Sequence, residues 1–308
     1  MARKQRKQGN TGSLKGFIIF LLLIAGAVWF TQGSSYQLPD LRKELPHLHE
    51  KKPSSAQSAP LTGNQEKVSS QMEIPRNLTD RKERILKRTG YTLSYNSFYK
   101  TPNWVAWELT RKETEGKAER YDKFLPDPDL PEPRVEHSDY TRSGYDRGHM
   151  APAADMKWSK KAMQESFYMS NICPQNQKLN RDDWGDLEDA CRKWARKYGT
   201  VYIACGPIYD KSKPERIGKH QVAVPDRFFK VVLINNRKNP IAMGFIFPNA
   251  AHHQKLEKYM SSVDDVEKAT GLDFFSRLPD SIENRIEAIV PALPVSYTHL
   301  TLPTTPYV

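Results

Sequence analysis

The chain has 308 residues, of which 38% are hydrophobic and 27% charged, and its formal net charge is +11. The composition is that of a soluble globular protein, and the length does not require a second domain beyond one of about 200 residues. The positive charge favours an anionic partner, although a solvated basic surface that serves solubility is an equally good interpretation.

The N-terminus carries several Lys and Arg residues, followed by an apolar run over residues 16–30 with no charge until Asp40. This pattern predicts a basic tail with a signal anchor over residues 1–31, and a cleaved signal peptide is the alternative. The positive residues would leave the N-terminus in the cytoplasm and the rest outside. We therefore expect a bacterial cell-envelope protein, held in the inner membrane or secreted.

Residues 32–75 are rich in Ser, Gln, Pro and Lys and predict a flexible linker. A folded domain is expected over residues 76–294. Aromatic and polar alternation and short apolar runs predict strands at 91–99, 104–109, 201–204, 228–234 and 241–247. Helical periodicity predicts helices at 159–168, 182–198 and 263–270, the last ended by Gly271. Without regular β-α-β alternation, this order predicts an α+β fold: an antiparallel sheet core with flanking helices.

The three cysteines, Cys173, Cys191 and Cys205, lack C-x-x-C spacing, which argues against a zinc knuckle or ribbon. In an exported domain two of them could pair and leave one over, and three buried free thiols are the alternative. The last residues, 295–308, resemble the translation of a sequencing adapter and predict a non-native tail.

A short motif, Asp146-Arg147-Gly148-His149, carries groups that phosphodiester cleavage needs. Hydrolysis requires a base that activates water and positive donors around the developing charge. Imidazole titrates near neutrality and suits the first role, while a guanidinium suits the second. Alone, a histidine next to a glycine is more often a structural or surface residue than a base.

A second set of residues, Asn180, Trp184, Glu188 and Arg192, recurs every four positions. On a helix these positions share one face, so an amide oxygen, a carboxylate and a guanidinium would project together. Asn180 could bind a hard cation and Arg192 a phosphate. An ordinary Glu188–Arg192 ion pair on a surface helix, with Trp184 packed inward, is the alternative.

Together these motifs, YDRGHMAP at 145–152, SNICPQ at 170–175 and the set that begins at Asn180, resemble the DNA/RNA non-specific endonuclease family. The resemblance covers roughly residues 76–294 and implies a ββα-metal (His-Me finger) active site. It implies that His149 is the general base, that Asn180 is the direct protein ligand of one Mg²⁺, and that Glu188 orients the hydrated cation. Mn²⁺ or another divalent cation is the alternative.

The same resemblance implies that Arg147 and Arg192 bind the phosphate and neutralise its charge, and that Asn171 supports the site by hydrogen bonding. One departure from the family is that no glycine follows Asn180, because the next residues are Arg181, Asp182 and Asp183. This departure puts the local turn in question. Asp146 is interpreted as structural, holding the motif loop.

The expected activity is hydrolysis of DNA and RNA without base preference, since no base-reading module is evident. A nucleic-acid-binding envelope protein without catalysis is a competing hypothesis, and a nuclease restricted to one nucleic acid is a third. The expected partners are therefore DNA, RNA and, through the N-terminal segment, a membrane. A homodimer is left open and no protein partner is inferred.

Overall fold

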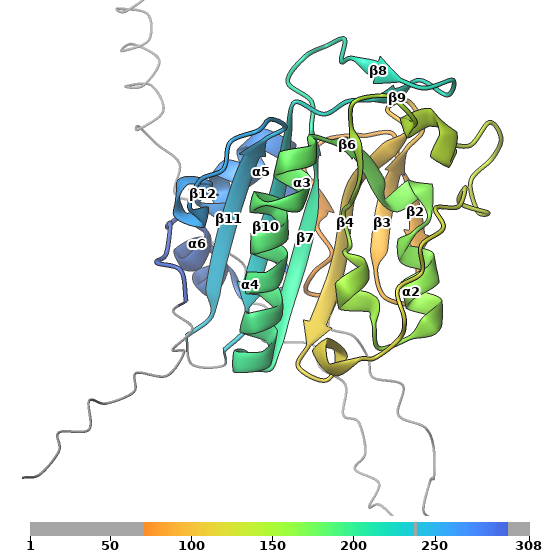
Figure 1. The fold of residues 1–308 in the computed structure, drawn as a ribbon. Coiled ribbons are helices and arrows are strands. Elements are labelled where there is room, and N and C mark those ends of the chain that lie inside the picture. The colour runs from red at the N-terminus through yellow and green to blue at the C-terminus, as the bar shows by residue number, and fades with distance from the viewer. Residues whose placement is uncertain (1–70, 237–238, 295–308) are drawn as a thin grey trace, which may run out of the picture. The chain divides into compact units, whose positions relative to one another are not determined.

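A computed structural model describes residues 71–236 and 239–294. The predicted membrane segment, nearly all of the predicted linker and the predicted tail lie outside these residues, so the domain boundaries stay a prediction. The described chain is built on a seven-stranded sheet in the order β12-β11-β10-β7-β4-β3-β2 (Figure 1), and every neighbouring pair of strands is antiparallel. Its strands are β2 (Arg84–Lys87), β3 (Thr92–Asn96), β4 (Thr101–Thr110), β7 (Thr200–Ile208), β10 (Arg227–Ile234), β11 (Ile241–Pro248) and β12 (Met260–Ser261).

The central strands are buried on both faces, and side-chain alternation divides the core into two layers. Along β10, Phe228 and Val232 join one apolar cluster, while Phe229 and Val231 join the other. Sheet strands that lie between two helical layers need apolar residues on both faces, which is why this strand is a nearly continuous apolar run.

Helices cover both faces of the sheet. On one face lies α4 (Asp183–Tyr198), preceded by the short α3 (Gln177–Arg181), while α2 (Lys160–Ser166) lies farther along the domain (Figure 1). Buried Leu187, Cys191 and Trp194 of α4 belong to the first cluster. On the other face α5 (Val263–Thr270) and α6 (Asp280–Glu287) contribute buried side chains to the second cluster.

Short two-stranded ladders complete the fold. They pair β1 (Arg76–Asn77) with β13 (Leu272–Asp273), β5 (Asp146–His149) with β6 (Ile172–Gln175), and β8 (Arg216–Ile217) with β9 (Val222–Ala223). Single 3-10 turns lie at Glu113–Glu115, His137–Tyr140, Ala153–Met156, Met169–Asn171 and Leu256–Lys258. The β5–β6 hairpin positions the candidate site.

The predicted α+β fold with an antiparallel sheet core is confirmed. The five predicted strands correspond to β3, β4, β7, β10 and β11, and the three predicted helices to α2, α4 and α5. Gly271 ends α5 with φ of 66°, a left-handed conformation that glycine adopts without steric cost. The three cysteines are buried free thiols, so of the two interpretations the one without a disulfide holds.

Candidate functional site

The DRGH motif forms strand β5, whose partner β6 comes from the second motif of the sequence. In the antiparallel register His149 pairs with Ile172 and Gly148 with Cys173. Alternation along the strand directs Arg147 and His149 to one face and Asp146 and Gly148 to the other. A Cβ on Gly148 would lie 2.1 Å from Oε1 of buried Gln175, so the tight pairing requires glycine here.

The ring of His149 lies in an aromatic cluster. Its centroid is 4.7 Å from that of Phe167, edge to face, and 5.4 Å from that of Phe124. Exposed Arg120 lies over the Phe167 ring of this cluster, with Cζ 5.1 Å from its centroid. The base candidate is therefore held by packing, which fixes its orientation.

The Nε2 atom of His149 is buried and has no hydrogen-bond partner among the described residues. Burial, and secondarily the charge of Arg120, lowers the pKa of His149 to about 3. The imidazole is therefore neutral at physiological pH, and in the tautomer that carries its proton on Nδ1 the Nε2 lone pair is free to accept a proton. This is the protonation state that a general base requires.

Arg147 shares the face of His149, and its Cζ lies 5.8 Å from the Phe124 centroid. One terminal nitrogen donates to the carbonyl of His137 at 2.8 Å and contacts that residue's Nε2 at 3.2 Å. Its Nε is buried without a partner among the described residues. The guanidinium thus has a fixed position with unused donor capacity, as a phosphate-binding group needs.

Asn171 is fully buried beneath the motif loop. Its Oδ1 accepts a hydrogen bond from the amide of Ala151 at 2.9 Å, and its Nδ2 donates to the carbonyls of Ala151 and Ser166. Its side chain therefore fixes the backbone that follows His149. This placement agrees with the expected support by hydrogen bonding.

On the opposite face of β5, Asp146 fastens the strand to α3. Its carboxylate accepts from Asn180 Nδ2 at 3.1 Å and from Arg181 at 2.9 and 3.0 Å. A carboxylate only accepts, so the amide nitrogen of Asn180 must face it and Oδ1 must point elsewhere. These contacts agree with the interpretation of Asp146 as a structural residue. Arg181, which stands where the family has a glycine, provides two of the three hydrogen bonds that hold β5 to α3.

The helical face predicted from Asn180 onward is divided between two helices. The backbone of Asp182, with φ −102° and ψ −95°, ends α3 and begins α4. The next residue, Asp183, is buried and accepts hydrogen bonds from Tyr259 Oη at 2.9 Å and from the backbone amide of Gln254 at 3.2 Å. Its carboxylate ties α4 to a distant loop, which gives the break a physical reason.

Glu188 is partly buried on α4 and takes part in no hydrogen bond or ion pair within residues 71–236 and 239–294. Burial raises its pKa to about 7, and the charge of Asp155 adds to this, while Lys230 and Arg192 oppose it. The carboxylate of Glu188 is thus available to a ligand, and whether it is ionised at neutral pH depends on Asp155, Lys230 and Arg192.

Arg192 does not pair with Glu188 as the alternative interpretation had it. One terminal nitrogen donates to Oδ1 of buried Asp155 at 2.8 Å and the other to Asp189. Although burial opposes it, these carboxylates hold the pKa of Arg192 above its ordinary value. Its guanidinium fork is already engaged by carboxylates, which places it differently from the phosphate contact expected of it.

Two buried groups next to Glu188 escaped the sequence analysis. Asp155 is also bonded to Trp107 Nε1 at 3.1 Å. Lys230 on β10 is fully buried, its Nζ has no hydrogen-bond partner among the described residues, and it lies 4.0 Å from the centroid of the Trp184 ring. The one available signal was a lysine inside an otherwise apolar strand. Arg120 is a third residue that the sequence analysis missed, and no sequence signal indicated it.

The donor set suits a hydrated divalent cation. Asn180 presents an amide oxygen and Glu188 a carboxylate, and within residues 71–236 and 239–294 neither oxygen group has a hydrogen bond or ion pair. Mg²⁺ prefers oxygen ligands and keeps several waters, so few protein ligands suffice. No hydrogen bond or ion pair in the described part of the chain joins His149 to either residue.

Comparison with known proteins supports the family resemblance. The family model described as DNA/RNA non-specific endonuclease matches residues 68–281. The Danio rerio protein "Nuclease EXOG, mitochondrial" is 42% identical over 208 residues, covering 62% of this chain and 60% of that one. "Nuclease 1, mitochondrial" of Schizosaccharomyces pombe is 38% identical over 210 residues, covering 62% and 65%. The chain thus spans less than two thirds of either relative.

Among solved structures, a chain from the crystal structure of the EndoG/EndoGI complex superposes with a TM-score of 0.63 at 30% identity. The match covers 72% of this chain and 95% of that one. The predicted family is confirmed by the family model, which matches more than half of the chain.

The predicted cell-envelope localisation is wrong, and the comparisons do not support the bacterial, membrane-anchored type. Both relatives above are mitochondrial nucleases of eukaryotes, which contradicts the expected cell-envelope localisation. Within residues 71–236 and 239–294, no helix combines the length and apolarity that crossing a bilayer requires. The predicted anchor lies outside these residues, and the comparisons give the expected membrane partner no support.

Proposed function

Because the chain belongs to the DNA/RNA non-specific endonuclease family, we propose that it hydrolyses phosphodiester bonds of both DNA and RNA without base preference, with His149 as general base. The observation that carries the proposal is the β5–β6 hairpin. It presents a neutral imidazole, with an unpartnered Nε2, beside the guanidinium of Arg147. Binding alone has no need of such a base.

In this mechanism Nε2 of His149 accepts a proton from the water that attacks phosphorus. Arg147 and Arg120 bind phosphate oxygens, and Asn171 keeps the loop after His149 in place. Since the Phe124 ring contacts the imidazole and Nε2 is buried, we infer that this ring moves aside when nucleic acid enters. Phosphate contacts carry no sequence information, which accounts for the lack of base preference.

Asn180 would hold the divalent cation through Oδ1, and Glu188 would orient the waters around it. Mg²⁺ is the proposed ion and Mn²⁺ the alternative. When bound, the cation supplies positive charge that stabilises the phosphate and its leaving oxygen. We assign Arg192 a positioning role, because its contacts with Asp155 and Asp189 fix it beside the carboxylate of Glu188.

The test is cleavage of supercoiled DNA and of RNA by the full chain, in Mg²⁺ and in EDTA. The wild type should degrade both substrates only with the divalent cation. His149→Ala should be slower by about 10²- to 10⁴-fold, the usual contribution of a general base. His252→Ala, which removes an exposed histidine elsewhere, is the matched control.

Undiminished cleavage by His149→Ala would remove the base assignment. If the wild type bound both nucleic acids but cleaved neither with any of several divalent metals, the competing hypothesis of a binding protein without catalysis would replace the proposal. Cleavage of only one nucleic acid would restrict the substrate and leave the mechanism standing.

A further inference from the structure

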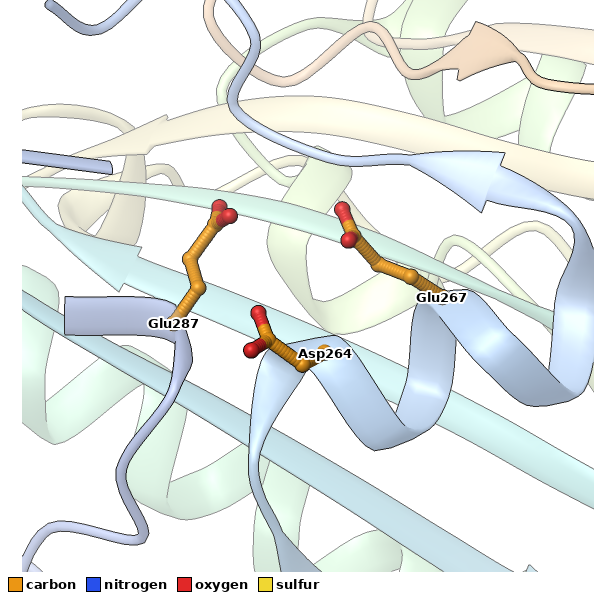
Figure 2. Close-up of side chains that lie close together, drawn as sticks. All are labelled: Asp264, Glu267 and Glu287. Atoms are coloured by element: carbon orange, nitrogen blue, oxygen red, sulfur yellow. The ribbon is translucent and has the colours of Figure 1, made fainter. Parts of the chain in front are cut away.

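Three carboxylates converge on the face of the sheet covered by α5 and α6. Asp264 and Glu267 lie one turn apart on α5, so their side chains share a face of the helix, and Glu287 is the last residue of α6. The three side chains point toward one another (Figure 2), and one oxygen from each lies within 4.8 Å of the other two. Two helices that are separate in sequence thus build one oxygen-rich cluster.

Glu287 is the unusual member of this cluster. It is 4% exposed, and its Oε1 is buried with no hydrogen-bond partner within residues 71–236 and 239–294. In that part of the chain none of the three carboxylates takes part in an ion pair. Glu267 Oε1 accepts a hydrogen bond from the backbone amide of Phe274 at 2.7 Å, which fixes its position. A buried carboxylate without a partner is costly, so an ordered glutamate here indicates that something neutralises it.

Electrostatics point the same way. Burial raises the pKa of Glu287 to about 9 and that of Glu267 to about 7, and neighbouring carboxylates add to both shifts. The cluster therefore repels its own negative charge. A cation placed between the three groups would remove both the repulsion and the unsatisfied acceptor.

We propose that Asp264, Glu267 and Glu287 form a binding site for one Ca²⁺ ion that fastens α6 to α5. Ca²⁺ takes about six to eight oxygen ligands at about 2.3–2.6 Å in flexible geometry, so three oxygens within 4.8 Å of one another can share one ion. Mg²⁺, at about 2.1 Å, demands near-ideal octahedral geometry and gives up its waters reluctantly, so a cluster of three protein carboxylates suits it less well. The exposed side chain of Asp264 leaves that side open to the waters that complete the shell.

The site is separate from the proposed nuclease centre. Buried side chains of α5 and α6 pack in the second apolar cluster, on the face of β10 opposite to that covered by α4. The ion would therefore act on the stability of the helical layer and not on the phosphodiester bond. Its binding can be measured in a protein that has no nuclease activity.

The experiment uses the full chain with Asn180→Ala and Glu188→Gln, so that the proposed nuclease centre cannot contribute. Equilibrium dialysis with ⁴⁵Ca²⁺ should give one ion per chain. The midpoint of thermal unfolding should rise by roughly 5–10 °C at a Ca²⁺ concentration a hundredfold above the dissociation constant.

Adding Glu287→Gln should abolish binding and the thermal shift. Asp264→Asn, at an exposed position where misfolding is not expected, should weaken binding about tenfold or more. The matched control is Asp265→Asn, which removes the same charge from an exposed position of the same helix and should bind Ca²⁺ as the parent does.

Absence of bound Ca²⁺ at millimolar concentration would overturn the proposal, and so would binding that survives both Glu287→Gln and Asp264→Asn. A chain that ignores Ca²⁺ but gains stability as the pH falls from 8 to 5 in EDTA would show that protons, and not a cation, neutralise the cluster. Neutralisation by protons alone would therefore also overturn the proposed Ca²⁺ site.

Discussion

Acidification should destabilise the folded domain through one histidine. Burial and Arg120 lower the pKa of His149 to about 3 in the folded state, whereas an unfolded chain has a histidine pKa of about 6.5. Between these two values the unfolded state binds the additional proton. Stability is therefore complete above about pH 6.5 and is lost as the pH falls toward 3.

The size of the effect follows from these pKa values. At pH 5 the unfolded histidine is protonated in a ratio of about 30 to 1, while the folded one is neutral, so this residue alone costs about 2 kcal/mol relative to pH 8. For a domain of this size, such a loss lowers the thermal midpoint by roughly 4–8 °C.

The assay is urea unfolding of the wild type and of His149→Gln at pH 8 and pH 5. The other titrating groups contribute equally to both proteins, so the difference between the two pH-dependent losses isolates the imidazole. We expect the variant to lose about 2 kcal/mol less than the wild type, and His252→Gln to lose as much as the wild type. Equal losses in wild type and His149→Gln would refute the argument, because the imidazole would then be as easily protonated when folded as when unfolded.

Three other substitutions, two of them with a matched control, test the packing and the charges around the site. Gly148→Ala should destabilise the domain by about 2–3 kcal/mol in urea unfolding and abolish cleavage, because the new Cβ would lie 2.1 Å from a buried side-chain oxygen. Gly185→Ala, with 3.8 Å of clearance inside α4, should leave cleavage unchanged and not lower stability, since alanine favours a helix over glycine by up to about 1 kcal/mol. Asp155→Asn should lower the unfolding free energy by about 3 kcal/mol, because the partly buried guanidinium of Arg192 would then pair only with exposed Asp189. Asp189→Asn should lower it by less than about 1 kcal/mol, since that carboxylate is exposed. Lys230→Met should keep the unfolding free energy within about 1 kcal/mol. It should nevertheless slow cleavage at pH 7 about tenfold, because the pKa of Glu188 rises without the ammonium charge. An unchanged cleavage rate would show that Lys230 has no effect on the site.

Local patterns were enough to predict most of the sheet and three helices. The helix at 263–270 is bounded by Ser262, whose hydroxyl caps it, and by Gly271, whose left-handed backbone ends it. Both signals lie within a few residues of the element. Strand β10 was likewise predicted from its apolar run, because a strand covered on both faces has no polar side.

Contacts between distant segments could not be predicted in this way. The four-residue spacing from Asn180 to Arg192 suggested one helix. However, the carboxylate of Asp183 accepts hydrogen bonds from a loop some 70 residues later, and the helix is interrupted at Asp182. In the same way Arg120 reaches the base only because the fold brings its loop against Phe167. Its own surroundings in the sequence give no sign of this.

The buried polar groups beneath α4 connect the fold to the proposed chemistry. Asp155 and Glu188 face Arg192 and Lys230, and these two cations lower the pKa of Glu188 while Asp155 raises it. Yet burial raises the pKa of Glu188 to about 7, so at neutral pH a proton competes for the carboxylate that is proposed to orient a hydrated cation. Lys230 and Arg192 oppose the effect of burial, and a divalent cation on Asn180 would add to their effect. The burial of Lys230 without a hydrogen bond from the described residues then has a physical reason. Its charge keeps Glu188 close to ionisation at the pH where the histidine base is already neutral.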